Sequence, residues 1–122
     1  MSIAEWSIGP QLVGVIFIIV GLVSYYFPPK KINDLYGYRT LSSKKNQQTW
    51  DAANRFSAVY SLKAGIVVLI AGILLHLLIE NMPWPPKTKT LLTFVSLLGS
   101  GIFTAVSLIV ATEKYLEKTF KD

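Results

Sequence analysis

The chain contains no cysteine and little charge. The absence of cysteine excludes disulfides, thiolate zinc sites and cysteine nucleophiles. Only 16% of its 122 residues are charged, whereas a soluble domain averages about 25%. The sequence also has no H-E-x-x-H, no G-x-S-x-G and no phosphate-binding glycine loop. We therefore expect one small domain that is not an enzyme and holds neither a metal nor a cofactor.

The apolar residues are concentrated in three long runs. Residues 8–27 and 91–111 contain no charge, and residues 56–79 are interrupted only by one lysine and one histidine. About 20 apolar residues are enough to cross the hydrocarbon core of a bilayer as a helix. The sequence thus predicts an all-α membrane protein with three transmembrane helices. The first run lacks a basic flank and a cleavage site, so we expect a span there rather than a signal peptide.

Positive charge is divided unevenly among the segments outside these runs. Nine lysines and arginines lie in the first loop and the C-terminal tail, and two lie in the N-terminus and the second loop. Cytoplasmic loops carry the excess of lysine and arginine. We predict a multi-pass membrane protein with the N-terminus outside and the first loop and C-terminus in the cytoplasm. The net charge of +5 then follows from topology, and nucleic acid is not an expected partner.

The first loop, residues 28–55, is expected to be structured. Ser42 or Ser43 can cap a helix that begins near Lys44, and no proline interrupts the chain from there through the second span. We predict a cytoplasmic helical extension over residues 43–55 that continues into that span.

One face of this extension combines amide and aromatic side chains. Asn46, Trp50 and Asn54 recur at a spacing of four, and Asp51 and Arg55 form a pair of opposite charge on the neighbouring stripe. Two interpretations of Trp50 stay open: an anchor at the membrane interface or a lid over a polar pocket. Before the extension, Gly37 fits a position where the backbone turns or approaches another group closely.

Several loop residues together resemble a family signature. The order and spacing are similar to those of the SdpI family, named for a bacterial immunity protein against a secreted killing peptide. That signature is an Asn, then Gly-(aromatic or Ile)-Arg-Thr, a Ser/Thr, and a Trp followed by a polar pair. The chain resembles a short three-span form of that family. The matching residues are Asn33, Gly37, Tyr38, Arg39, Thr40, Ser42 or Ser43, Asn46, Trp50, Asn54 and Arg55.

The resemblance implies a protein of the bacterial inner membrane with an immunity or sensor role. A toxin peptide or a cytoplasmic regulator is then the candidate partner. In the founding member, the membrane protein binds the toxin and then holds a transcription repressor at the membrane. For this chain we expect Arg39 to supply a charge-assisted contact, Asn33 and Asn54 to position the loop, and Trp50 to cover the site. The candidate binding residues are Asn33, Gly37, Tyr38, Arg39, Thr40, Trp50, Asp51, Asn54, Arg55 and Lys63.

Ionisable residues inside the second run require an explanation. A lysine at the centre of a membrane helix costs about 2.5–3.5 kcal/mol. Lys63 either extends to the interface or joins Arg39 and Arg55 in a site for an anion such as a lipid headgroup, a phosphorylated metabolite or a carboxylate. His76 and Glu80 are four residues apart and can pair. The alternatives for that pair are a metal site at an oligomer interface or a proton-linked switch.

Small residues recur every seven positions in each apolar run. They fit a packing seam between helices. The serines and threonines of the third run also fit a polar path, and an oligomeric transporter or channel for a small solute is the alternative function. Three spans seldom enclose a path, so that alternative requires a homo-oligomer. An enzyme acting on a lipid or peptide is a third hypothesis, with Asp34 or Asp51 as the evident general base.

Overall fold

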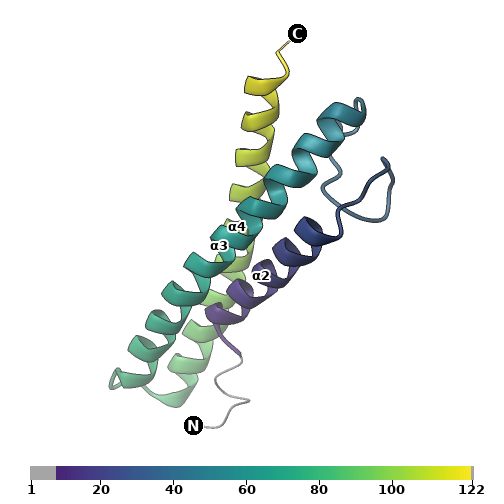
Figure 1. The fold of residues 1–122 in the computed structure, drawn as a ribbon. Coiled ribbons are helices and arrows are strands. Elements are labelled where there is room, and N and C mark those ends of the chain that lie inside the picture. The colour runs from purple at the N-terminus through teal and green to yellow at the C-terminus, as the bar shows by residue number, and fades with distance from the viewer. Residues whose placement is uncertain (1–7, 122) are drawn as a thin grey trace.

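A computed structural model describes residues 8–121 as three helices joined by one long and one short connection. The helices are α2 (Pro10–Tyr26), α3 (Gln47–Asn81) and α4 (Pro86–Thr119), and they run alternately up and down (Figure 1). No strand occurs within residues 8–121, so the prediction of an all-helical fold is confirmed. α3 and α4 are long and apolar enough to cross a membrane, whereas α2 is a shorter apolar helix of 17 residues.

The start of α3 differs from the predicted one. The helix begins at Gln47 rather than near residue 44, and its cap is Asn46 rather than a serine. Asn46 Oδ1 accepts from the backbone N–H of Thr49 at 2.9 Å, and Thr49 Oγ1 accepts from the N–H of Asn46 at 3.2 Å. This reciprocal pair satisfies two amide groups at the helix start. Ser43 cannot serve as the cap because its hydroxyl is fully buried and bonds to loop carbonyls.

Both long helices extend well past their apolar segments. With 35 and 34 residues, each is about 50 Å long, compared with about 30 Å for a hydrocarbon core. The surplus is polar: residues 47–55 precede the apolar part of α3, and residues 112–119 follow that of α4. Both extensions lie at the end of the bundle where α2 stops and the long loop begins (Figure 1). At the other end, residues 82–85 join α3 to α4 in a short turn.

Glycines allow the backbones of α2 and α3 to approach closely. A Cβ added at Gly65 would lie 2.6 Å from the backbone nitrogen of Ile18, and one at Gly21 would lie 2.6 Å from that of Leu62. Real Cβ atoms essentially never approach backbone atoms this closely. The predicted packing seam is therefore confirmed for these two helices, whose contacts dominate the fold.

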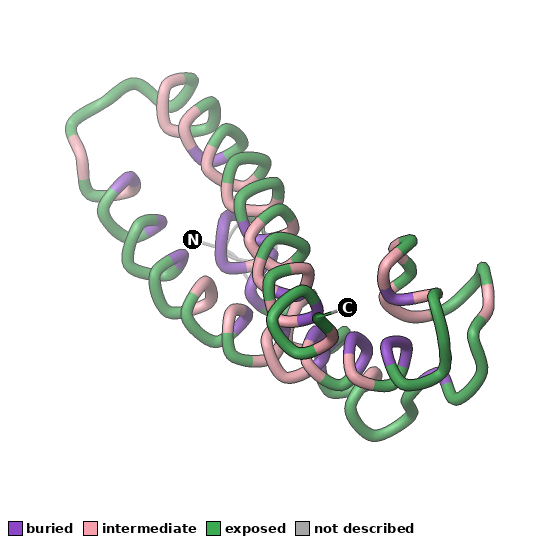
Figure 2. Tube along the Cα trace, turned by 90° about the horizontal axis from the view of Figure 1, so that it is seen from above, coloured by how far each residue is buried: buried purple, intermediate pink, exposed green. Residues whose placement is uncertain are grey.

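α4 is held more loosely. Only 6% of its most apolar 18-residue stretch is buried inside the protein, compared with 22% for α3. Figure 2 shows the outer faces of the helices as exposed, with the buried residues gathered where helices face one another. In a bilayer such apolar faces contact lipid.

The hydroxyl groups of the predicted stripe on α4 donate to carbonyls of their own helix. Thr104 Oγ1, for example, donates to the carbonyl of Ser100 at 2.6 Å. The bonding of these hydroxyls is thus accounted for without a solute path. The same pattern holds for Thr93, Ser96, Ser100, Ser107 and Thr112.

Candidate functional site

The long loop, residues 27–46, turns sharply at Gly37 and packs against α3. Gly37 has φ 106°, a left-handed conformation that favours glycine. A Cβ there would lie 2.6 Å from Asn54 Oδ1 and 2.5 Å from Pro29 Cγ. The turn and the close approach expected at this position are both present.

Two buried side chains of α3 hold this part of the loop. Asn54 Oδ1 accepts from the N–H of Tyr38 at 2.6 Å, and its Nδ2 donates to the carbonyls of Tyr38 and Trp50. The Trp50 side chain is fully buried, and its Nε1 donates to the carbonyl of Pro29 at 2.6 Å. Trp50 therefore lies inside the protein and fixes the start of the loop to α3. The amide–aromatic face predicted for the helical extension is the face that packs.

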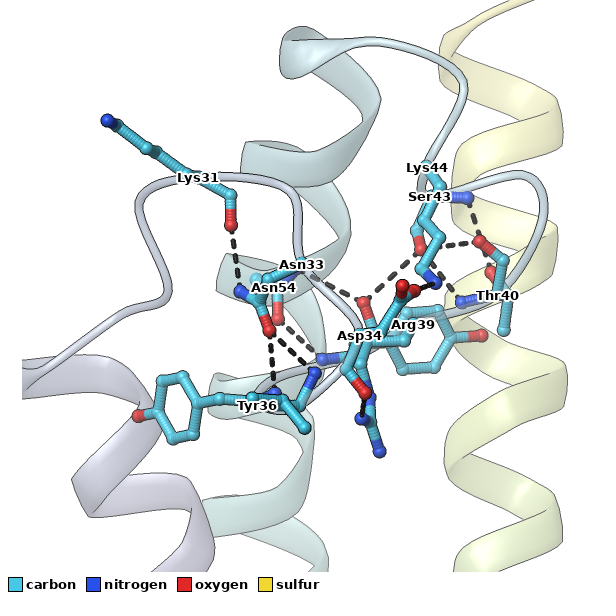
Figure 3. A network of polar contacts seen from close by, with 11 residues as sticks. Lys31, Asn33, Asp34, Tyr36, Arg39, Thr40, Ser43, Lys44 and Asn54 are labelled. Carbon is cyan, nitrogen blue, oxygen red and sulfur yellow. Dashed lines mark hydrogen bonds and ion pairs between the residues drawn. The ribbon is translucent and has the colours of Figure 1, made fainter.

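Asn33 shapes the loop from within. Its Oδ1 accepts from the N–H groups of Leu35 and Tyr36 at 2.9 and 2.7 Å, and its Nδ2 donates to the carbonyl of Lys31 at 2.8 Å (Figure 3). This is a side chain substituting for backbone in a turn. Asn33 and Asn54 thus position the loop as predicted, one from the loop and one from the helix.

Arg39 is exposed and closes the loop on itself. Its guanidinium donates to the carbonyl of Asp34, and the carboxylate of Asp34 pairs with Lys44 (Figure 3). The bound Lys44 ammonium holds the pKa of the Asp34 carboxyl below its usual range. Arg39 is exposed, and only one donor of its guanidinium is engaged with the described residues, so the other donors are available to a partner.

Glu113 at the end of α4 binds the other side of the same motif, and sequence reasoning did not identify it. The hydroxyls of Tyr38 and Thr40 donate to Glu113 Oε2 at 2.9 and 3.2 Å, and that of Ser42 donates to Oε1. Burial raises the pKa of the Tyr38 phenol, and the hydrogen bond to the Glu113 carboxylate raises it further. One carboxylate thereby joins the loop to α4, an arrangement we call the Glu113 clasp.

A signal for the clasp was present in the sequence. Tyr38, Thr40 and Ser42 alternate with Arg39 and Leu41, and side chains two apart in extended backbone point to the same side. Three hydroxyls on one side suit a common acceptor. The acidic residue closest after the third apolar run was the obvious candidate, but its partner segment lies more than 70 positions away.

The remaining candidate residues are not all brought together. Arg55 lines a pocket of about 510 Å³ between the end of α2, the loop and the start of α3, whereas Arg39 and Lys63 do not line it. Asp51 Oδ1 accepts from Gln47 Nε2 at 2.7 Å, and no ion pair between Asp51 and Arg55 is found among the described residues. Lys63 is exposed on α3. The expected cluster of three cations is thus dispersed.

At the opposite end of the bundle, His76 lies almost completely buried. Its Nε2 is 3.7 Å from Glu80 Oε1, so the predicted pair is present, and its Nδ1 is hydrogen bonded to Gln11 Nε2 at 2.7 Å. In the part of the chain that the structure describes, no group of three or more His, Asp or Glu side chains is arranged to hold a metal.

Comparison with known proteins identifies the family. The model of the SdpI/YfhL protein family matches residues 30–112, which include most of the loop, all of α3 and most of α4. The chain belongs to this family. Over 62 residues it is 45% identical to a Bacillus subtilis (strain 168) protein described as "Uncharacterized protein YfhL", covering 51% of this chain and 56% of that protein.

The chain therefore spans about half the length of that SdpI/YfhL relative. No solved structure matches the chain. Family membership, together with two helices that are long and apolar enough to span, makes this a membrane protein of the SdpI/YfhL family.

Proposed function

We propose that this SdpI/YfhL protein is an immunity or sensor protein that binds an antimicrobial peptide through the loop of residues 27–46. It lies in the bacterial cytoplasmic membrane with all three helices spanning, the N-terminus outside and the loop and C-terminus in the cytoplasm. The loop and the polar ends of α3 and α4 gather at one end of the bundle and contain eight lysines and arginines, which supports that orientation.

One observation carries the binding role. The loop is fixed to α3 by Asn54 and to α4 by Glu113, yet it exposes two leucines beside Arg39. Leu35 and Leu41 are 90% and 92% exposed. A connecting segment needs neither a fixed shape nor large apolar side chains in solvent, whereas a recognition loop needs both.

The chemistry of this surface fits an amphipathic peptide. Exposed leucines provide apolar contact area, and the unengaged donors of the exposed Arg39 guanidinium suit a carboxylate. A peptide that presents an apolar side chain and a carboxylate at the cytoplasmic face would find a partner group for each. A cytoplasmic regulator that uses the same chemistry is the partner the family resemblance also suggests.

Survival assays test the proposal. A peptide-sensitive bacterium expressing the protein should tolerate a higher dose, and Arg39→Ala should remove that protection while the variant still inserts in the membrane. Trp50→Ala should also remove it, because the start of the loop loses its attachment to α3. Lys31→Ala is the matched control, since it removes the same charge from the same loop and its side chain points away from the network (Figure 3). Full protection by Arg39→Ala and Trp50→Ala would exclude the loop as the site, and solute flux through liposomes containing the protein would indicate a transporter instead.

Orientation is testable separately because the chain contains no cysteine. Single cysteines are placed at Lys45 in the loop and at Lys87 at the opposite end of the bundle. In intact cells a membrane-impermeant maleimide should label Lys87→Cys and leave Lys45→Cys unlabelled until the cells are opened. The reverse pattern would invert the proposed topology.

A further inference from the structure

The pocket between the end of α2 and the start of α3 has a chemistry that the peptide-binding loop does not use. It measures about 510 Å³ and has both polar and apolar walls. Its lining residues are Ser24, Tyr25, Pro28, Pro29, Lys30, Gln47, Asp51, Asn54 and Arg55. We propose that this pocket binds the headgroup of an anionic phospholipid that carries hydroxyl groups, of the phosphatidylglycerol class.

The walls of the pocket are fixed without a ligand. Gln47 Nε2 donates to the carbonyl of Lys30 at 2.6 Å and to Asp51 Oδ1 at 2.7 Å, so one amide joins the loop wall to the helix wall. Trp50 Nε1 donates to the carbonyl of Pro29 at 2.6 Å, which fixes Pro29 in the wall of the pocket. A preformed pocket avoids the cost of ordering its walls when a ligand binds.

Two cations make the pocket a site for an anion. Lys30 and Arg55 are both exposed, and no ion pair engages either one among the described residues. Guanidinium binds phosphate oxygens in a bidentate manner, and an ammonium adds a point charge beside it. Asp51 carries the opposite charge, so the lining retains a net charge of +1.

Asp51 also gives the pocket a reason to prefer a hydroxylated headgroup. Only its Oδ1 is bonded within the described part of the chain, so Oδ2 can accept a hydroxyl. The amide of Asn54 is committed to Tyr38 and Trp50 and provides no further recognition. A phosphodiester held by Lys30 and Arg55 would therefore place its glycerol hydroxyls against Asp51.

The position of the pocket favours a lipid over a soluble phosphate. It opens at the end of the apolar helix α2, beside the exposed aromatic residues Tyr25, Tyr26 and Phe27. Aromatic side chains of this kind gather at the level of the headgroups. Acyl chains of a lipid whose headgroup fills the pocket would run along the exposed apolar face of α2.

Lipid binding to the full chain purified in mild detergent tests the proposal. Native mass spectrometry counts phosphatidylglycerol or phosphatidylcholine retained during titration. We expect phosphatidylglycerol to bind more tightly, and Lys30→Gln/Arg55→Gln to weaken it about tenfold or more, because each basic residue near anionic lipid contributes appreciable attraction. The control Lys31→Gln/Lys45→Gln removes the same charge from the loop outside the pocket and should have little effect.

Equal losses in the two double variants would overturn the proposal in favour of unspecific charge attraction, as would an unchanged affinity in Lys30→Gln/Arg55→Gln. Asp51→Asn should reduce the preference for phosphatidylglycerol over phosphatidic acid, and an unchanged preference would overturn the role of the hydroxyl groups. Displacement of the lipid by inorganic phosphate or glycerol phosphate at equal concentration would overturn the lipid assignment. Retention of the circular dichroism spectrum in each variant establishes that its fold is intact.

Discussion

The two interfaces of α3 are built in different ways. Against α2, glycines bring the two backbones into contact along much of the helix. Against α4, contacts are fewer, and at the loop end Phe56 stacks on Tyr115 with ring centroids 4.5 Å apart. The polar bonds at this end join α4 to the loop, where Glu113 receives the hydroxyls of three loop residues. Lipid provides no hydrophobic drive between helices, so close packing and hydrogen bonds must supply the association. The α2–α3 interface uses close packing, whereas α4 is held at the loop end by an aromatic stack on α3 and by hydrogen bonds to the loop.

The largest expected effect comes from placing a larger side chain between α2 and α3, where glycines now allow the backbones to touch. Gly65→Leu places a side chain 2.6 Å from the backbone nitrogen of Ile18, where no flexible atom can move aside. We expect a loss of about 3 kcal/mol in the free energy of unfolding, the upper end of the usual range for overpacking. Denaturation by sodium dodecyl sulfate, followed by circular dichroism, measures it. Gly99→Leu is the matched control because nothing lies within 4 Å of a Cβ there; equal losses would show that the seam is not the cause.

Removal of the acceptor in the Glu113 clasp should have the next largest effect. Glu113→Ala leaves the hydroxyls of Tyr38, Thr40 and Ser42 without their common acceptor, at a cost of about 2 kcal/mol. We expect protease cleavage of the loop to become faster while the α2–α3 seam stays intact. Glu113→Gln retains one acceptor oxygen and should be intermediate. If the loop of Glu113→Ala resists protease as well as the wild type does, the clasp does not hold it.

A smaller effect is expected for the bond between Trp50 and Pro29. Trp50→Phe keeps most of the buried ring but removes the donor to the Pro29 carbonyl, and we expect a loss of about 1 kcal/mol in the free energy of unfolding. Hydrogen exchange should rise at the start of the loop and stay unchanged along α2. An equal rise in hydrogen exchange across the whole protein would contradict a local role for this bond.

The smallest expected effect is on the pH at which Tyr38 ionises, and it does not change the fold at neutral pH. Because the pKa of Tyr38 is raised above its usual value of 10.0, the folded state favours the protonated phenol. Its contribution to stability is complete below the unfolded pKa and is lost as pH rises through the folded one. The difference in ultraviolet absorbance between wild type and Tyr38→Phe, followed as the pH rises, should therefore show a phenol that ionises at a higher pH than an ordinary tyrosine. In Glu113→Gln this phenol should ionise at lower pH; identical curves would remove Glu113 as a cause.

The loop motif shows which features of the site can be predicted from the sequence and which cannot. The turn at Gly37 and the shared helical face of Trp50 and Asn54 follow from local rules, since they depend on residues close in sequence. The contact of Asn54 with Tyr38 spans 16 positions, and the burial of Trp50 against Pro29 differs from both interpretations, an interface anchor and a lid.

The predicted serine cap of α3 is wrong because several polar residues compete for that position and Asn46 occupies it. Ser43 is excluded only because the folded loop uses its hydroxyl elsewhere.

The sequence by itself determined three apolar helices, the glycine seam and the concentration of positive charge at one end. These features depend on periodicity and composition, which local physics fixes. Tertiary structure decided that Glu113 binds Tyr38, Thr40 and Ser42, that Arg55 lines a pocket with Lys30, and that Arg39 and Lys63 lie outside it. Such long-range pairs depend on the rotation and offset of one helix against another, and several arrangements satisfy the same hydrophobic pattern.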